Sequence, residues 1–244
     1  MILFFPLAPR AEIHLLHDIQ TPALIAHASG ALNGKIYLNS FEALVNAAAN
    51  GFQLIELDLL ETTDGRLIAA HDWKTFHQLT GKPEQTKPLS FNQARKRKIL
   101  GTQHVLTDTD IFHFFNNRPD LYLVTDKIEN LSLLKEKFGA FQDRIIVEVF
   151  TLLKYQEAVS LGFKNVAFCV WDNDSFYDLA HIYKIPLITM PSEAIPNRLD
   201  WLKAHPDITV LSFSTNDAST IQKYAPFISF WYTDDLTPPN PGFL

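Results

Sequence analysis

Two acidic side chains interrupt an otherwise apolar run in the first quarter of the chain. Glu56 and Asp58 lie two residues apart in FQLIELDLL, residues 52–60. The continuous apolar character predicts a strand covered on both faces. Because side chains alternate along a strand, both acids share the face of Leu54 and Leu60.

Two buried carboxylates repel each other and are costly to remove from water. A divalent cation would relieve both effects, and hard oxygen ligands favour Mg²⁺ or Ca²⁺. The alternative is a polar strand face open to solvent, or an acid paired with a lysine.

Two histidines stand at the ends of neighbouring apolar runs. His27 ends the run in LIAHAS, and His71 ends RLIAAHD. The turn residues Asp64 and Gly65 predict a hairpin that folds the second run back along the acidic strand. A lone histidine at a strand end is usually structural. Two of them beside two acids favour a site in which one imidazole acts as a base and the other as an acid, because imidazoles titrate near neutral pH.

A third strand adds another acid and a lysine. LYLVTDK, residues 121–127, ends in Asp126 and Lys127. Asp126 is a candidate third oxygen ligand for the cation, and Lys127 is a candidate contact for a phosphate group. Two histidines, three carboxylates and one lysine, with no cysteine among them, predict metal-assisted phosphodiester chemistry.

Aromatic residues near the same strand ends are candidate walls of the pocket. Trp73 follows His71 closely and is predicted to contact the substrate. Trp171, Trp231 and Tyr232 also lie at strand ends, where lining the mouth and packing in the core are equally open.

The elements that must position these residues follow a regular alternation. Helical patterns separate the apolar runs, and from residue 121 onward the runs begin about twenty residues apart. Eight such units predict an α/β fold, a single (β/α)₈ TIM barrel spanning 1–244 with a β-hairpin extension after the second strand. Active sites of this fold lie at the carboxyl ends of the strands. For the unexpected acid Glu148, in IIVEVF, a position in the barrel lumen is one of the alternatives left open. The predicted strands are 23–28, 52–60, 121–126, 144–150, 165–171, 185–190, 208–214 and 227–233.

Composition excludes several classes of function. The net charge is −6, so a nucleic-acid partner is not expected, and the basic run 95–98 is expected on a solvated helix face. The single cysteine excludes an internal disulfide. No apolar stretch reaches the roughly 18 residues that a membrane span needs. The apolar start, residues 1–10, lacks a basic segment and a cleavage site. It is interpreted as a cover of the barrel bottom or a loose end, which predicts a cytoplasmic protein. No oligomeric state is indicated.

The order of the motifs resembles a known family. IAHASG, NSFEAL and GFQLIELDLLETTDGRLIAAHD, followed late in the chain by WYTDDL, are similar to the glycerophosphodiester phosphodiesterases. That family has a His-Arg-Gly strand end, an Asn-Thr helix start, Glu-x-Asp on the second strand, a Thr-x-Asp-Gly turn and a His-Asp pair. The resemblance covers the motif-bearing core, residues 24–238, and is most specific over 24–72.

The resemblance implies a TIM barrel of the phosphatidylinositol-phospholipase-C-like superfamily. His27 and His71 would be the acid/base pair, and Glu56, Asp58 and Asp126 the ligands of Mg²⁺ or Ca²⁺. A small-molecule glycerophosphodiester would be the substrate. In the family, a hydroxyl beside the phosphodiester attacks in line and expels the leaving alcohol, and the cyclic phosphate is then hydrolysed.

Several positions depart from the family pattern. Ala28 stands where the family has the arginine that contacts phosphate, and Lys35 or Lys127 is a candidate replacement for its charge. Leu38 stands where the family has a glutamate. The third ligand, usually Glu with a lysine two places on, is Asp126 followed at once by lysine. The family's substrate-specifying insertion is short here. Two other hypotheses therefore stand beside hydrolysis: a sphingomyelinase-D-like lyase that cyclises a phospholipid, and an inactive barrel that binds a phosphorylated lipid or glycan.

Overall fold

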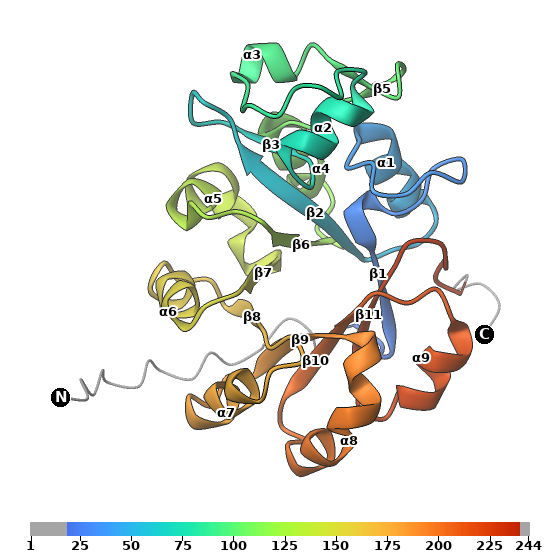
Figure 1. Cartoon of the computed structure of the whole chain (residues 1–244), viewed down its shortest axis with the longest axis vertical. Helices are drawn as coiled ribbons and strands as arrows, with labels where there is room; N and C mark the ends of the chain where they lie inside the picture. Colours follow the sequence, from blue (N-terminus) through green and yellow to red (C-terminus); the bar gives the residue numbers. More distant parts are fainter. Residues whose placement is uncertain (1–18, 240–244) are drawn as a thin grey trace.

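The computed structural model describes residues 19–239 of the 244-residue chain. Eight parallel strands form a closed barrel in which the first strand pairs with both the second and the last, as Figure 1 shows. This confirms the predicted TIM barrel, and each predicted strand is present with its ends moved by a few residues. The barrel strands, in order around the sheet, are β1 (Ala23–Ala26), β2 (Leu54–Glu61), β6 (Tyr122–Asp126), β7 (Ile145–Val149), β8 (Asn165–Cys169), β9 (Leu187–Pro191), β10 (Thr209–Phe213) and β11 (Phe230–Thr233).

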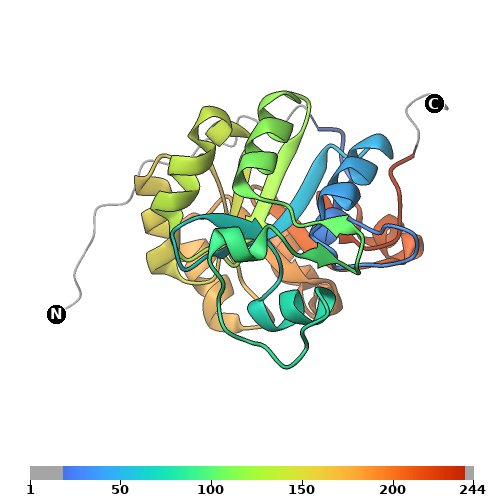
Figure 2. The same ribbon diagram turned by 90° about the horizontal axis from the view of Figure 1, so that it is seen from above.

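Helices connect consecutive strands and surround the barrel (Figures 1 and 2). Several begin at a hydroxyl residue whose side chain accepts a hydrogen bond from the first turn: Ser40 accepts from Ala43, and Thr107 from Asp110. Within residues 19–239 no helix follows β11. The connecting helices are α1 (Phe41–Ala49), α4 (Asp108–Asn116), α5 (Leu131–Phe138), α6 (Leu152–Ser160), α7 (Asp174–Ile182), α8 (Ile195–Ala204) and α9 (Ala218–Tyr224).

The core has an inner and an outer layer, and β2 contributes to both. Leu54 packs inside the barrel against residues such as Ile25 and Val124. Ile55, Leu57 and Leu59 pack outward in the larger cluster beneath the helices. The alternation inferred from the sequence is therefore confirmed. It directs Glu56 and Asp58 to the lumen side.

The chain between β2 and α4 folds as an added subassembly over one side of the barrel (Figure 1). It has its own small apolar cluster. The predicted hairpin is confirmed, since β3 pairs antiparallel with the end of β2. The elements of this segment are β3 (Leu67–Ala69), α2 (Trp73–Leu79), α3 (Phe91–Ala94), β4 (Lys98–Ile99) and β5 (Gln103–His104).

The basic run in this segment corrects one prediction. Residues 95–98 were expected on a solvated helix face, and Arg95, Lys96 and Lys98 are exposed as expected. However, α3 ends at Ala94 and the run forms a turn that enters β4 at Lys98. Arg97 is half-buried, because its guanidinium contacts the Nδ1 of His77 at 3.0 Å and donates to Thr80 at 3.2 Å. Tertiary hydrogen bonds, which the charge pattern does not reveal, determine this conformation.

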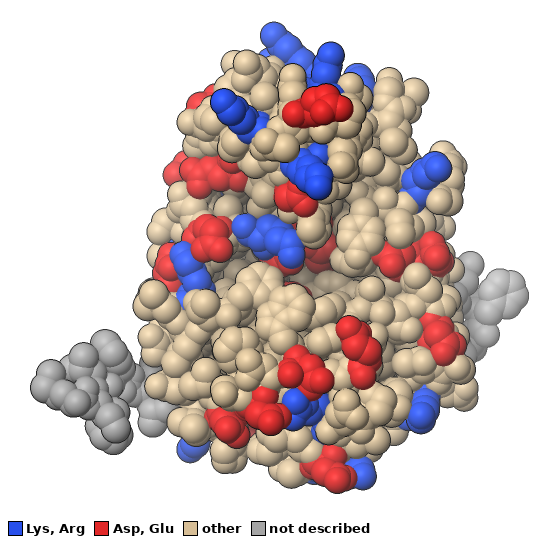
Figure 3. Space-filling model, viewed as in Figure 1, with Lys and Arg blue, Asp and Glu red and all other residues tan. Residues whose placement is uncertain are grey.

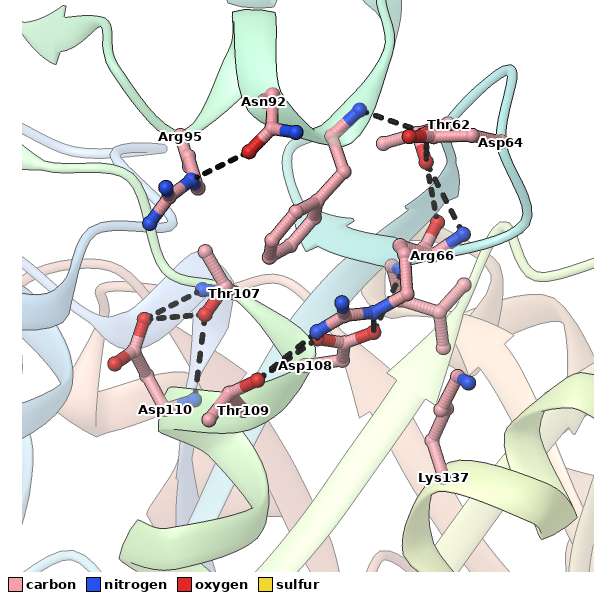
Figure 4. Close-up of polar contacts among 12 residues, drawn as sticks. Thr62, Asp64, Arg66, Asn92, Arg95, Thr107, Asp108, Thr109, Asp110 and Lys137 are labelled. Carbon is pink, nitrogen blue, oxygen red and sulfur yellow. Dashed lines mark hydrogen bonds and ion pairs between the residues drawn. The ribbon is translucent and has the colours of Figure 1, made fainter.

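A half-buried ion pair fixes the hairpin to α4 (Figure 4). Arg66, after the hairpin turn, donates from Nε to Asp108 Oδ2 at 2.7 Å, and the Asp108 side chain is only 2% exposed. The guanidinium also lies 3.9 Å from the ring centroid of Phe91. Asp64, in the turn, accepts a 2.7 Å hydrogen bond from the backbone N–H of Phe91. These contacts hold the hairpin, and with it the segment that carries His71.

Two further sequence predictions concern the chain ends and the membrane. The predicted cover formed by residues 1–10 lies outside the described residues, although Ile19 packs in the inner cluster of the barrel. Among the helices of residues 19–239, none has the length and apolar character that crossing a bilayer needs.

Candidate active site

Three carboxylates meet at the carboxyl ends of β2 and β6. Asp58 and Asp126 are register partners on the two adjacent strands, and Glu56 lies one lumen-facing position below Asp58. One oxygen from each of Glu56, Asp58 and Asp126 lies within 4.8 Å of the other two. Glu56 is 3% and Asp58 is 3% exposed. Parallel strands with matching register therefore bring together acids that are far apart in the sequence.

Burial and mutual repulsion determine the electrostatics of this cluster. Burial, followed by the charges of Asp58 and Asp126, raises the pKa of Glu56 well above its usual range. Burial, followed by the charge of Asp58, raises the pKa of Asp126 to about 7. The cluster therefore holds protons near neutral pH when no cation is bound.

Two oxygens of the cluster have no protein partner. Glu56 Oε1 and Asp126 Oδ1 are buried and accept no hydrogen bond from the described residues. Three other oxygens are held: the Ala28 N–H donates to Glu56 Oε2 at 2.6 Å, the Asn39 amide donates to Asp58 Oδ2 at 2.8 Å, and Lys127 Nζ lies 2.9 Å from Asp126 Oδ2. Unpaired buried carboxylate oxygens are costly. The set of hard, converging oxygen donors fits a divalent cation such as Mg²⁺ or Ca²⁺.

His27 lies directly after β1 and is held by a carboxylate. Its Nδ1 is 3.0 Å from Asp234 Oδ1, and both side chains are largely buried. Asn216 fixes Asp234 in turn, because its amide oxygen accepts the Asp234 backbone N–H at 2.8 Å. The last strand end and the loop after β10 thus orient the imidazole that follows the first strand.

His71 follows β3 and has a similar arrangement. Its Nδ1 is 2.7 Å from Asp72 Oδ2. Asp72 is also the N-cap of α2, and it accepts the Thr75 N–H at 2.7 Å. Burial opposes ionisation of Asp72, but the hydrogen bonds from Thr75 and His71 outweigh it and lower the pKa of Asp72. Both histidines therefore have Nδ1 beside a carboxylate.

Lys127 supplies the positive charge of the site. Its Nζ lies 2.9 Å from Asp126 Oδ2, and its backbone has φ of 60°. Burial disfavours the ammonium ion, but the charges of Asp126 and the other acids outweigh this and raise the pKa of Lys127. Lys127 is the single Lys or Arg among the described residues that line the cavity. Lys35, the other candidate, is exposed and is not among them.

The three carboxylates, the two histidines and Lys127 border one cavity of about 180 Å³, which also has an aromatic side. Figure 3, viewed as in Figure 1, shows a hollow near the middle of the molecule, with acidic atoms inside and a basic side chain at its edge. On the aromatic side Trp171 stacks on Phe150, with ring centroids 6.1 Å apart, and meets Phe213 edge-on at 5.5 Å. The described residues that line the cavity are His27, Tyr37, Glu56, Asp58, His71, Asp126, Lys127, Glu148, Phe150, Trp171, Phe213, Ser214 and Tyr232.

The aromatic predictions have mixed outcomes. Trp171 and Tyr232 line the cavity, whereas Trp231 is fully buried in the outer core. Trp73 does not line it. Its ring instead packs edge-on against Phe76 at 5.6 Å, because α2 turns this face toward the small cluster of the added segment.

Glu148 takes the lumen position, which the sequence left open. It lines the cavity and accepts a hydrogen bond from the Tyr232 hydroxyl. Burial, followed by the charge of Asp126, raises the pKa of Glu148 well above its usual range.

The sequence reasoning missed several residues of the site: Phe150, Phe213 and Ser214 of the lining, and also Asp234 and Tyr37. Asp234 was quoted only as part of the WYTDDL motif. It directly follows the last strand, which in a closed barrel pairs with the first, and that position was the signal that could have identified it. Tyr37 gave no signal, because a loop rather than a strand carries it.

Comparison with known proteins places the chain in a family. The sequence model of the glycerophosphoryl diester phosphodiesterase family matches residues 31–209. The chain belongs to this family. The matched stretch contains His71 and the three clustered carboxylates. His27 and Asp234 lie outside it; the closed barrel brings His27 to the same cavity and Asp234 to its Nδ1.

The similar proteins include a curated sequence relative and several solved structures. Mouse (Mus musculus) lysophospholipase D GDPD3 is 23% identical over 201 residues, which cover 74% of this chain and 60% of that protein. The chain thus spans about 60% of the length of that protein. A glycerophosphodiester phosphodiesterase from Parabacteroides distasonis has a TM-score of 0.68 at 15% identity, with 87% of this chain and 92% of the other covered.

Two further solved structures are similar in fold. A glycerophosphodiester phosphodiesterase from Thermotoga maritima has a TM-score of 0.67 at 17% identity, covering 87% of this chain and 94% of the other. An Oleispira antarctica phosphodiesterase, solved with its product sn-glycerol-3-phosphate, has a TM-score of 0.66 at 15% identity, covering 88% and 93%.

Proposed function

We propose that the chain is a metal-dependent phosphodiesterase that uses His27 and His71 as its acid/base pair. One observation carries the proposal. Three clustered carboxylates and two histidines, each with Nδ1 beside an acid, line a single cavity at the carboxyl ends of the barrel strands. Family membership supports the same chemistry.

Glu56, Asp58 and Asp126 would hold the cation. A bound Mg²⁺ or Ca²⁺ would neutralise the cluster and supply Lewis-acid polarisation of the phosphoryl group. Lys127, beside Asp126, would pair with a non-bridging oxygen of the phosphodiester and fix its position.

The two histidines would transfer the protons. A carboxylate at Nδ1 keeps the ring proton on that nitrogen in the neutral imidazole, so Nε2 carries the lone pair that a base needs. Within residues 19–239 neither Nε2 has a hydrogen-bond partner. One histidine would take the proton of the attacking hydroxyl as its oxygen bonds to phosphorus. The other, as imidazolium, would protonate the leaving oxygen as its bond to phosphorus breaks. Asp234 and Asp72 would stabilise the imidazolium form of their partners.

The lining of the cavity bears on the substrate. The aromatic wall formed by Phe150, Trp171 and Phe213 continues into a neighbouring cavity that shares Lys127 and Phe150 and also includes Leu153, which is 73% exposed. Apolar surface beside a phosphate site favours a substrate with an apolar portion. A lysophospholipid is therefore a second candidate substrate beside a small glycerophosphodiester, and it accords with the name of the mouse relative.

A panel of phosphodiesters tests the proposal. Glycerophosphocholine, lysophosphatidylcholine and sphingomyelin would be incubated with the protein and Mg²⁺ or Ca²⁺, or with EDTA, and followed by ³¹P NMR. We expect turnover with the metal and none with EDTA. A phosphomonoester product indicates hydrolysis, and a persistent cyclic phosphate indicates the lyase reaction.

A matched pair of variants on one strand controls this assay. Glu56→Gln should abolish turnover, whereas Glu61→Gln, at the exposed end of β2, should not. Metal-dependent binding of these phosphodiesters without turnover would support an inactive binding barrel instead.

A further inference from the structure

Tyr37 is a cavity residue to which the chemistry above gives no role. It lies in the loop between β1 and α1, and its ring meets that of His27 edge-on, with centroids 4.6 Å apart. The ring centroid of Tyr37 also lies 6.3 Å from that of His71, again with the rings edge-on. The phenol is thus in contact range of both imidazoles at the mouth of the cavity.

The backbone of Tyr37 is held in an unfavourable conformation. Its φ of 59° lies in the left-handed region, which is uncommon for a bulky side chain. Two residues later, Asn39 fixes the loop: its N–H donates to the Ala28 carbonyl at 3.1 Å, and its side-chain amide donates to Asp58. Backbone strain of this kind persists where surrounding contacts impose it, and it concentrates at functional sites.

The hydroxyl of Tyr37 has no hydrogen-bond partner among residues 19–239. Burial, followed by the charges of Asp234, Asp58 and Glu56, raises the pKa of Tyr37 to about 12. The hydroxyl is therefore protonated at neutral pH. It is a neutral hydrogen-bond donor near Asp234, Asp58 and Glu56. Those acids offer it no hydrogen bond, so the donor remains available for a ligand.

The cavity is short of donors for an anion. Lys127 is its single Lys or Arg among the described residues, and it is paired with Asp126. At position 28, after the first histidine, the side chain is a buried alanine methyl and the backbone N–H already serves Glu56. A phosphodiester carries two non-bridging oxygens, and each keeps lone pairs for a further donor after the cation and Lys127 have bound.

We infer that Tyr37 is a substrate-binding residue whose hydroxyl donates a hydrogen bond to a non-bridging oxygen of the phosphodiester. The inference rests on the proposed function of this cavity. The phenol would act from the loop side, between the two histidines, while Lys127 acts from the β6 side. The phosphoryl group is thereby held between the two imidazoles.

Substitution by phenylalanine isolates the hydroxyl, because the ring and its contacts with the histidines remain. In the Mg²⁺-loaded protein, Tyr37→Phe should weaken binding of sn-glycerol 3-phosphate, measured by calorimetry, by about 10-fold or more. It should lower kcat/KM for bis(p-nitrophenyl) phosphate similarly. Tyr183→Phe, on the protein surface, is the matched control and should change neither. The limbs of the pH–rate profile should stay in place, because the hydroxyl transfers no proton.

The outcomes separate this inference from the proposed function. If the wild type turns over substrate and Tyr37→Phe has the same affinity and the same kcat/KM, the inference is overturned and the proposed function stands. A normal Tyr37→Phe together with a defective Tyr37→Ala would assign the residue a packing role and also overturn it. Weaker binding in Tyr37→Phe supports it even if wild type turns over no substrate. A wild-type protein that neither binds nor cleaves these phosphate compounds overturns both.

Discussion

Asp58 and Asp126 are register partners on adjacent parallel strands, and their carboxylates meet at the same end of the barrel. No backbone or side-chain donor satisfies Asp126 Oδ1 within the described residues. The two acids are close because the closed sheet fixes them there, so the fold itself maintains the repulsion that a cation would relieve.

Metal-free stability should fall as pH rises. The pKa of Asp126 is raised to about 7 in the folded chain, whereas the unfolded value is about 4. The folded state therefore binds more protons at Asp126 between these values, so the contribution of Asp126 to stability is full below about pH 4 and is lost as pH rises through about 7. Chemical denaturation in EDTA from pH 4 to 8 measures this. Asp126→Asn should flatten the profile, and an equally steep profile in that variant would refute the assignment.

Metal should stabilise the wild type and not the ligand variants. A cation present at 100 times its Kd stabilises a folded protein by about 2.7 kcal/mol. Thermal melts with and without Mg²⁺ or Ca²⁺ should show this shift in wild type and in Glu61→Gln. The shift should be absent in Glu56→Gln and Asp58→Asn, which should themselves be at least as stable as wild type in EDTA. Equal shifts in all four proteins would show that the cation binds elsewhere.

Replacing Asp234 should lower the turnover rate more than it lowers the melting temperature. Asp234→Asn removes the charge beside His27 Nδ1 and should lower kcat at least about 10-fold, because the imidazolium loses its partner. Asp235→Asn, on the exposed neighbour, is the control. Asp72→Asn is a less clean probe, since Asp72 also caps α2. Steady-state rates and melting temperatures of the two variants measure turnover and stability separately. Full activity in Asp234→Asn would exclude a role of Asp234 in orienting His27.

The hairpin anchor should affect stability without affecting chemistry. Asp108→Asn breaks the pair with Arg66 and should cost about 1–3 kcal/mol in the free energy of unfolding, less than a fully buried pair because Arg66 is partly exposed. Asp120→Asn, which breaks the exposed pair with Arg118, should cost at most about 1 kcal/mol. Urea denaturation measures both. Loss of turnover in folded Asp108→Asn would place this anchor in the active site.

Much of the fold and the centre of the site could be predicted from local patterns. Continuous apolar runs at regular spacing indicate parallel strands covered on both faces. The alternation within β2 assigns Glu56 and Asp58 to the lumen. A residue at a strand's carboxyl end can be placed at the mouth without knowing its contacts.

Residues placed by loops or by tertiary contacts could not be predicted. Tyr37 reaches the cavity through a left-handed backbone conformation that a Tyr does not signal. Asp234 meets His27 only because the last strand closes against the first. Trp73 was misplaced because the packing of α2, rather than nearness to His71 in sequence, determines its direction. The basic run 95–98 was misplaced for the same kind of reason.

The acid/base roles of His27 and His71 are tested most directly by the turnover of the Mg²⁺-loaded protein on a phosphodiester with a poor leaving group, such as glycerophosphocholine or lysophosphatidylcholine. Each alanine variant should lose about 10²–10⁴ in kcat. The double variant should be little worse than either single, because the two groups serve one proton-transfer sequence. The wild-type rate should follow a bell-shaped pH profile that loses one limb in each single variant. Wild-type turnover in both single variants, on a substrate that the protein demonstrably cleaves, would contradict these roles.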